Sequence, residues 1–269
     1  MNICVKELGY AMILLLGPIT FGTIMCYPSP AGKEIREHFK LSENAAEWSF
    51  YNSVSSLFAI AGPFVTVGFL KAYHNSRKKV VFTCACLGTA FWLLNCLTKI
   101  NIWAGIIVRL FLGIVMGAYS SINPMYLVEI APEGTTGFFG SLNQIGIVVG
   151  IVFFDFIAPS LTYMSLNYIG AAICALQACL IWIVEESPVV EKLKKEEEEK
   201  SNEHEHKKET LWQKKYAFGL CSGILMMLFQ QFCGINAILT NLSDIMNDSG
   251  LDIDGNYQAG IASCAQLIA

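Results

Sequence analysis

Long apolar runs recur along the chain, and they constrain its fold more than any other feature of the sequence. A bilayer core is about 30 Å thick, and an α-helix needs about twenty apolar residues to cross it. Only 15% of the residues are charged, against about 25% in soluble domains. The sequence therefore predicts an all-α polytopic membrane protein. Runs of spanning length lie near residues 8–27, 50–70, 80–98, 102–127, 138–158, 163–184 and 216–240, and an eighth begins near Tyr257.

The positive charges predict an orientation. If the N-terminus is cytoplasmic, the inner loops receive thirteen of the eighteen Lys and Arg residues: Lys6, four between positions 71 and 79, and eight between 192 and 215. Four fall outside, and Arg109 lies within the fourth run. Positive residues near span ends favour the cytoplasmic side. We therefore expect a multi-pass protein with a cytoplasmic N-terminus, and we expect it in the plasma membrane.

A charged segment divides the chain. Residues 185–215 include VEKLKKEEEEKSNEHEHKKE, which is too polar to bury a core. We predict a six-helix bundle over residues 1–184, a cytoplasmic linker over 185–215, and the start of a second bundle over 216–269. His204 and His206 flank Glu205 in the linker, but nothing fixes a coordination geometry there, so we predict no metal site and no cofactor.

Several classes of function find no support in the sequence. There is no basic patch that could follow a phosphate backbone, so a nucleic-acid partner is not expected. The ten cysteines lie mostly inside apolar runs without a C-x-x-C motif, where cysteine behaves as a small hydrophobic residue. No nucleophile–base pair, metal cluster or phosphate loop stands in a credible context. We therefore do not expect an enzyme.

Uncharged amides interrupt two of the apolar runs. Gln144 lies in the fifth run, and Gln230, Gln231 and Asn236 lie close together in the seventh. Amides donate and accept hydrogen bonds without charge, which suits a neutral polyhydroxylated ligand. The alternative is that they tie helices together, at about 0.6 kcal/mol each. Gly234 weakens the helix beside Asn236, and carriers place their sites at such breaks.

Several motifs resemble the sugar porter family of the major facilitator superfamily. QQFCGINAI resembles the QQ-x-x-GIN signature of the seventh helix, and GFFGSLNQIGIVVG resembles the fifth-helix pattern. The stretch RLFLGIVMGAYSSINPMYLVEIAP resembles the fourth helix, ESP resembles the close of the sixth, and FGTIMCYPSP resembles the first helix of hexose facilitators. The resemblance implies a major facilitator fold, of which this chain holds the first six-helix bundle and one to two helices of the second.

The resemblance also implies roles for particular residues. It implies that sugar hydroxyls contact amides in the fifth, seventh and eighth helices, and that charged residues of the inner loops and the fourth helix are gating or structural. The implied sugar-binding residues are Gln144, Gln230, Gln231, Asn236 and Gln266; the implied gating or structural residues are Arg77, Lys78, Arg109, Glu129 and Glu186.

The inner loops depart from the family pattern. Where the loop between helices two and three has Asp, Gly and Arg in the family, this chain has Ala72, Asn75 and Ser76. Thr136 stands in place of the usual Arg after helix four, so Glu129 lacks its nearest expected partner. Networks of such pairs can set a conformational balance of a few kcal/mol. We expect a weakened cytoplasmic latch, and a shift in the resting population when Thr136→Arg restores the charge.

Two departures bear on mechanism. Thr240 and Asn241 replace a pair of gate tyrosines. Ile24 replaces the first-helix Asp of proton-coupled members, which favours facilitated diffusion; Asp155 is the other candidate titratable group. A carboxylate is the natural proton carrier at membrane depth.

The resemblance thus implies a facilitative transporter of a hexose or related neutral polyol that works by alternating access in a lipid bilayer. Its partner would be a small neutral sugar. Because the eighth run is cut at Ala269 after about thirteen residues, too short to cross a bilayer, we expect a partial chain. A non-transporting sugar sensor or receptor and an inactive truncated carrier remain as alternatives.

Overall fold

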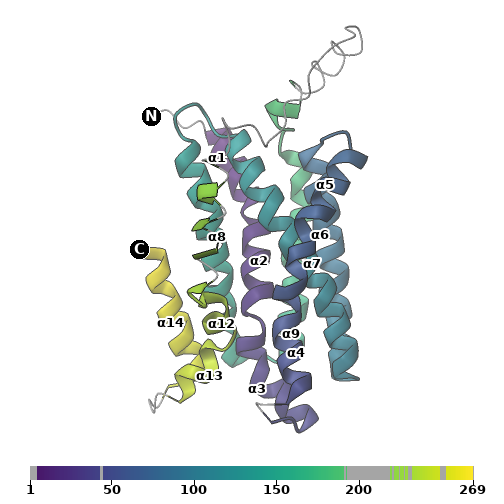
Figure 1. The fold of residues 1–269 in the computed structure, drawn as a ribbon, viewed down its shortest axis with the longest axis vertical. Helices are drawn as coiled ribbons and strands as arrows, with labels where there is room; N and C mark the ends of the chain where they lie inside the picture. The colour runs from purple at the N-terminus through teal and green to yellow at the C-terminus, as the bar shows by residue number, and fades with distance from the viewer. Residues whose placement is uncertain are drawn as a thin grey trace.

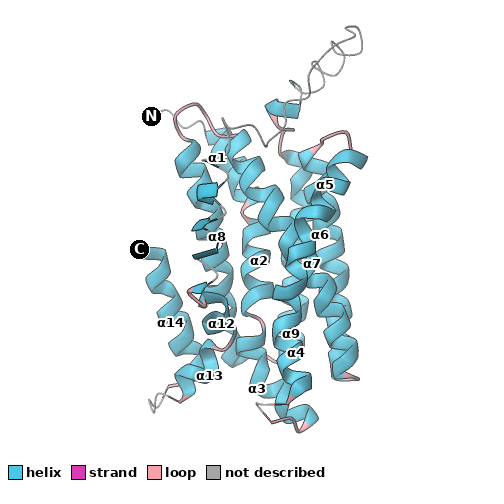
Figure 2. Ribbon diagram, in the orientation of Figure 1, coloured by secondary structure: helices cyan, strands magenta, loops and turns pink. Residues whose placement is uncertain are grey.

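The computed structural model describes most of the chain. It covers residues 5–42, 45–190, 192, 232–248 and 253–268, together with eight positions between 219 and 229, while the side chains of Asn236, Leu267 and Ile268 lie outside the description. Every regular element among these residues is a helix (Figure 2). The all-α prediction is confirmed.

Six helical segments of the described chain are long and apolar enough to cross a membrane, which confirms the six predicted spans that precede the linker. The first extends further than predicted, because short helices continue it as far as Phe39. The helices of these spans are α1 (Val5–Leu14), α2 (Leu16–Cys26), α3 (Pro28–Phe39), α4 (Ala46–Phe58), α5 (Gly62–Ala72), α6 (Arg77–Leu94), α7 (Ile102–Glu129), α8 (Thr136–Ile157) and α9 (Tyr163–Leu180).

The six spans form one bundle in which α2 packs against α7, α8 and α9 (Figure 1). The backbones of α2 and α8 are in direct contact. A Cβ atom added to Gly22 would lie 2.1 Å from the carbonyl oxygen of Ile147, and one added to Gly150 would lie 2.3 Å from that of Ile19. Lipid offers no hydrophobic drive for helix association, so close van der Waals packing at small residues takes its place.

The bundle has two ends, which we name by the N-terminus. The N-proximal end carries the N-terminus and the turns that follow α5, α7 and α9; the distal end carries α3 and the start of α4 (Figure 1). Large side chains fill the interior at both ends, with Trp92 packed edge-on against Tyr27 at a centroid distance of 5.4 Å. Outward-facing apolar side chains, such as Phe64 at 75% exposure, suit a lipid solvent.

The second half begins with short helices. They are α12 (Ile235–Thr240), α13 (Leu242–Asn247) and α14 (Gly255–Ile268). The break predicted near Gly234 is present: this residue has φ 67°, in the left-handed region, and precedes α12. A second break at Asn241 separates α12 from α13. Of the linker predicted over 185–215, residues 193–215 lie outside the described chain.

Candidate functional site

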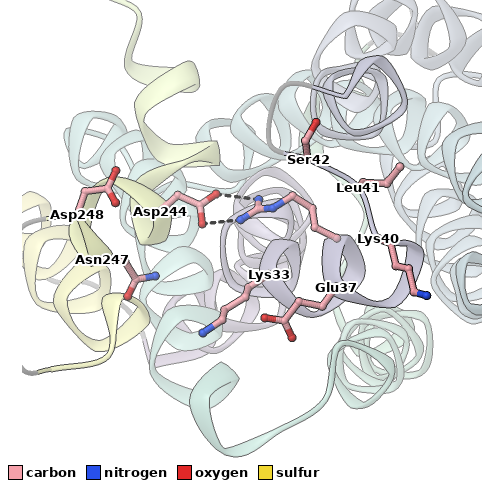
Figure 3. Close-up of a pocket in the computed structure, with 9 residues that line it drawn as sticks. Lys33, Glu37, Lys40, Leu41, Ser42, Asp244, Asn247 and Asp248 are labelled. Atoms are coloured by element: carbon pink, nitrogen blue, oxygen red, sulfur yellow. Dashed lines mark hydrogen bonds and ion pairs between the residues drawn. The ribbon is translucent and has the colours of Figure 1, made fainter.

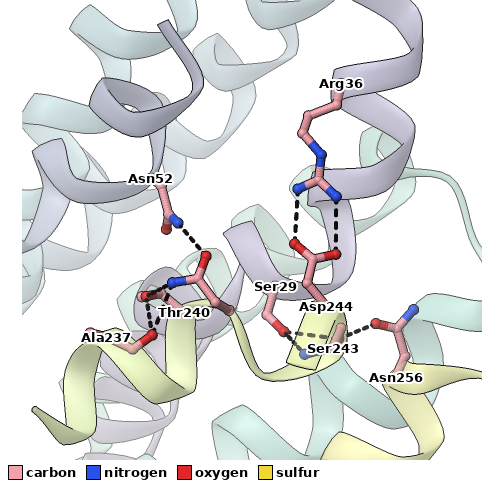
Figure 4. A network of polar contacts seen from close by, with 9 residues as sticks. Ser29, Arg36, Asn52, Ala237, Thr240, Ser243, Asp244 and Asn256 are labelled. Carbon is pink, nitrogen blue, oxygen red and sulfur yellow. Dashed lines mark hydrogen bonds and ion pairs between the residues drawn. The ribbon is translucent and has the colours of Figure 1, made fainter. Parts of the chain in front are cut away.

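An ion pair joins the two halves at the distal end (Figure 4). The Arg36 guanidinium on α3 donates to both carboxylate oxygens of Asp244 on α13, at 2.9 and 3.0 Å. Arg36 is only 8% exposed, and its guanidinium lies 5.0 Å from the ring centroid of Trp48. Two parallel hydrogen bonds to a carboxylate are the strong, geometrically specific form of this interaction. The pair therefore fixes α13 against the first bundle.

Two uncharged contacts accompany this ion pair. The Ser29 hydroxyl donates to the Ser243 hydroxyl at 2.8 Å, and the Asn52 amide donates to the Asn241 amide oxygen at 2.9 Å. Both serines are buried, and the Ser243 hydroxyl also contacts Asn256 (Figure 4). We call the three pairs, Arg36–Asp244, Ser29–Ser243 and Asn52–Asn241, the distal clasp. Each pair joins the first bundle to the second half of the chain.

Two hollows of different chemistry flank the clasp. One, of about 620 Å³, has a charged wall (Figure 3); the other, of about 480 Å³, lies between α4 and α12 and has no charged side chain among its lining residues. Both volumes fall within the usual range of small-molecule sites, about 300–1,000 Å³. The charged hollow is lined by Lys33, Arg36, Glu37, Lys40, Leu41, Ser42, Asp244, Asn247 and Asp248. The uncharged hollow is lined by Trp48, Ser49, Asn52, Ser53, Ser56, Ala237, Thr240 and Asn241.

The structure locates two of the five predicted sugar-binding side chains. Gln144 on α8 and Gln266 on α14 are both exposed. Gln230 and Gln231 lie outside the described residues, as does the side chain of Asn236. The described chain therefore does not bring the predicted set together, and their sugar-binding role stays a prediction.

Arg109 is fully enclosed within the first bundle. Its Nε donates to the carbonyl oxygen of Tyr51 at 2.9 Å, and its guanidinium lies 5.4 and 4.9 Å from the ring centroids of Tyr27 and Tyr51. The Ser55 hydroxyl donates to the carbonyl oxygen of Arg109 at 2.8 Å. These hydrogen bonds and cation–π contacts fasten α7 to α2 and α4, so the observed contacts of Arg109 are structural.

At the N-proximal end, Arg77 and Glu129 form a second bidentate ion pair. Arg77 Nε and Nη2 donate to the Glu129 carboxylate at 3.1 and 3.0 Å, and its Nη1 donates to the carbonyl oxygen of Asn75 at 2.7 Å. Glu129 lacks the Arg expected at position 136, but Arg77 from the start of α6 pairs with it instead. Although Thr136 stands where the family has an Arg, the Glu129 carboxylate is still paired.

Glu186 completes this end by capping α6. Its carboxylate accepts from the backbone N–H groups of Arg77 and Lys78 at 3.0 and 3.3 Å, and it contacts the Ser76 hydroxyl. An anion at a helix N-terminus is stabilised by the free N–H groups and the helix dipole. Lys78 Nζ donates to the carbonyl oxygen of Trp182 at 3.2 Å. We call Arg77, Lys78, Glu129 and Glu186 the N-proximal cluster; all four were singled out from the sequence.

An exposed ion pair ties α1 to the same end. Lys6 Nζ donates to Glu185 at 2.6 Å, and this hydrogen bond holds the pKa of the Glu185 carboxyl below its usual range. Solvent screens such a pair, so it contributes little to stability. The Tyr126 hydroxyl also donates to the carbonyl oxygen of Glu185, at 2.6 Å.

Sequence reasoning did not identify most of the distal clasp. Arg36 and Asp244 are 208 residues apart, and each is an ordinary charged residue at the end of a span. Asn241 was noticed as a replacement for a gate tyrosine, but its partner Asn52 was not. The signal that could have indicated Asn52 was a polar stripe in an apolar run, since Ser49, Ser53 and Ser56 share its helix face.

Comparison with known proteins places this architecture in a family. The profile of the Major Facilitator Superfamily matches residues 12–269, nearly the whole chain. The chain belongs to this superfamily. The membership implied by the sequence motifs is confirmed, and the helices up to Ile183 correspond to the first of the two bundles of such carriers.

The curated relatives of this superfamily member are named as sugar transporters, which confirms the resemblance seen in the motifs. Sugar transporter ERD6-like 16 from Arabidopsis thaliana is 27% identical over 96% of this chain and 60% of its own length. Sugar transporter ERD6 from the same plant is 28% identical over 78% of this chain and 47% of its own length. The chain thus spans about 60% or less of these relatives.

Solved structures share the fold. A D-xylose–proton symporter superposes with a TM-score of 0.72 at 21% identity, covering 96% of this chain and 66% of that one. The xylose transporter XylE bound to 6-bromo-6-deoxy-D-glucose superposes with a TM-score of 0.74 at 19% identity, covering 98% and 67%. The major facilitator fold predicted from the sequence is confirmed.

Proposed function

We propose that the protein carrying this chain transports a hexose or a related neutral polyol across a membrane by alternating access. The distal clasp is the observation that carries the proposal. Alternating access requires an interface between two bundles that can close and separate, and the clasp is a closed interface of hydrogen bonds between the first bundle and α13. The relatives named as sugar transporters support the same class of substrate.

The chemistry near the clasp favours a neutral polar substrate. The hollow between α4 and α12 is lined by hydroxyl and amide side chains, including those of Ser53, Ser56 and Asn241. Such groups match sugar hydroxyls as donors and acceptors without adding charge. A charged substrate would need a buried counter-ion. The hollow between α4 and α12 does not supply one, because no charged side chain is among its lining residues.

Transport is tested in proteoliposomes that contain the full-length native protein carrying this sequence. We expect saturable exchange of radiolabelled hexose that unlabelled sugar inhibits. Gln144→Ala should weaken this exchange, because the family resemblance implies that the Gln144 amide contacts sugar and its side chain is exposed on α8. Ser141→Ala, an exposed position one turn earlier on the same helix, is the matched control. Saturable binding without flux would instead favour a sugar sensor, and neither binding nor flux would favour an inactive carrier.

We further propose that the N-proximal end faces the cytoplasm and that the protein resides in the plasma membrane. Support comes from the excess of Lys and Arg in the loops on that side. The bundle of residues 1–184, the linker of 185–215 and the second bundle from 216 are the domains of this proposal. An impermeant reagent added to intact cells should label a cysteine placed at exposed Lys40 and spare one placed at exposed Lys79. The opposite pattern would reverse the orientation.

A further inference from the structure

Asp155 is a buried acid that belongs to neither the distal clasp nor the N-proximal cluster. Asp155 lies near the distal end of α8, within a span of mean hydropathy 1.8, and is 1% exposed. Its Oδ1 atom has no hydrogen-bond partner, and no ion pair to it is found among the described residues. Every carboxylate in the distal clasp and the N-proximal cluster is paired, so Asp155 stands apart.

The surface that covers Asp155 belongs to the second half of the chain. α14 packs along α8, and Ser263 on α14, itself 1% exposed, lies near the carboxylate without forming a hydrogen bond of ordinary geometry. One turn farther into the membrane, the thiol of Cys26 on α2 lies 3.9 Å from the carbonyl oxygen of Ile151. Asp155 is therefore enclosed between the two halves, at the interface that alternating access must open.

The neighbouring helices offer this carboxylate no compensating charge. Cys26 on α2 is a thiol whose sulfur contacts the Ile151 carbonyl oxygen, and Arg109 on α7 donates from Nε to the Tyr51 carbonyl oxygen and forms no ion pair with Asp155. Glu34 on α3 accepts from the Tyr163 backbone N–H at 2.7 Å. The titratable side chains of α14 among the described residues are Tyr257 and Cys264, and no Lys, Arg or His lies on that helix. An unpaired carboxylate enclosed in this way is far more costly to bury than the neutral acid.

From this juxtaposition we propose that Asp155 is a proton-binding residue that couples proton movement to sugar transport. When the α8–α14 interface is open to water, the carboxylate takes up one proton and becomes a neutral acid. The closed interface buries that acid. When the halves rearrange and the carboxyl reaches water on the opposite side, it releases the proton and becomes a carboxylate again. The position where proton-coupled family members have a first-helix Asp is occupied here by Ile24, a buried apolar side chain that cannot bind a proton. The inference rests on the proposed function and specifies its coupling ion.

The first test uses proteoliposomes that contain the full-length protein, with the external medium more acidic than the interior by one pH unit. One proton per sugar then supports up to about tenfold accumulation of the sugar inside. We expect the wild type to accumulate hexose. Asp155→Asn should retain exchange at a reduced rate and lose accumulation, and Asp155→Glu should restore part of it. Glu34→Gln removes an exposed distal carboxylate and is the matched control, with accumulation unchanged.

The outcomes separate the two proposals. Wild-type exchange with no response to the pH gradient would overturn the coupling and leave sugar transport intact, whereas no exchange at all would overturn the transport function and the coupling with it. Accumulation that persists in Asp155→Asn would overturn the role of this residue.

Infrared spectroscopy tests the bound proton without any sugar. We expect a carbonyl band of a protonated carboxylic acid near neutral pH that is absent in Asp155→Asn and present in Glu34→Gln. A spectrum unchanged in Asp155→Asn would contradict the proposal, even if that variant proved too unstable for flux measurements.

Discussion

The two ends of the bundle carry similar ion pairs with different connections. In the N-proximal cluster, Arg77 and Glu129 join α6 to α7, and both helices belong to the first bundle. In the distal clasp, Arg36 and Asp244 join α3 to α13, across the two halves. Both pairs are bidentate, so geometry alone does not distinguish them. The difference lies in what must move when each pair breaks.

This difference assigns separate physical roles to the two ends. The halves can separate while Arg77 and Glu129 stay together, so their energy contributes to the stability of the bundle in every state. The halves cannot separate at the distal end until Arg36 and Asp244 part, so their energy contributes to one conformation only. A ligand or a mutation shifts a conformational equilibrium only through such differential contacts.

The largest expected effect comes from locking the distal clasp covalently. The hydroxyl oxygens of Ser29 and Ser243 are 2.8 Å apart, so Ser29→Cys with Ser243→Cys should form a disulfide, whose sulfurs lie about 2.05 Å apart. Oxidation should abolish sugar flux because the halves can no longer separate, and a reductant should restore it. Uptake before and after reduction measures the effect, with each single variant as a control for the native cysteines. Full flux through the cross-linked protein would show that this end does not open.

The next largest effect is on stability and lies at the N-proximal end. The side chains of Arg77 and Glu129 are 7% and 13% exposed, and removing one partner of a buried pair costs about 3–5 kcal/mol. Arg77→Gln should therefore lower the thermal unfolding temperature of the purified protein. Lys79→Gln removes an exposed charge two residues away and serves as the control. Equal unfolding temperatures for the two variants would mean that the N-proximal cluster adds nothing to stability.

A smaller, conformational effect should follow from weakening the distal clasp. The Asp244 side chain is 28% exposed, so we expect Asp244→Asn to shift the balance by about 1–2 kcal/mol, a five- to thirtyfold change in population. The readout is the rate at which a thiol reagent labels Ser29→Cys, a buried position, and this rate should rise. Asp248→Asn, on the same charged hollow, is the control. If Ser29→Cys is labelled at the same rate with Asp244→Asn as with Asp248→Asn, the Arg36–Asp244 ion pair does not hold the distal end closed.

How much of this was predictable depends on whether a signal is local. The spans follow from runs of apolar residues, and the break at Gly234 follows from a glycine beside polar residues, so both were found in the sequence. The N-proximal cluster was found because the family motifs contain it. The pairing of Arg77 with Glu129 was missed, because a motif gives residue types and does not show which side chain reaches which partner.

The distal clasp could not be predicted for a related reason. Asp244 lies 208 residues beyond Arg36, and the contact depends on how α13 bends away from α12 at Asn241. No periodic pattern in the sequence marks that bend. Asp155 was visible as an acid within a span, but its enclosure by α14 required the fold.

The smallest expected effect tests whether the two ends communicate. The sequence predicts a shift in the resting population on Thr136→Arg, because Thr136 stands where the family has an Arg near Glu129. Since Arg77 already pairs with Glu129 at 3.0 Å, and Thr136 is exposed, an added Arg should contribute less than about 1 kcal/mol. The labelling rate of Ser29→Cys should then stay within about fivefold of its value without Thr136→Arg. A change as large as that expected for Asp244→Asn would support the weakened-latch hypothesis, because a charge at the N-proximal end would then govern opening at the distal end.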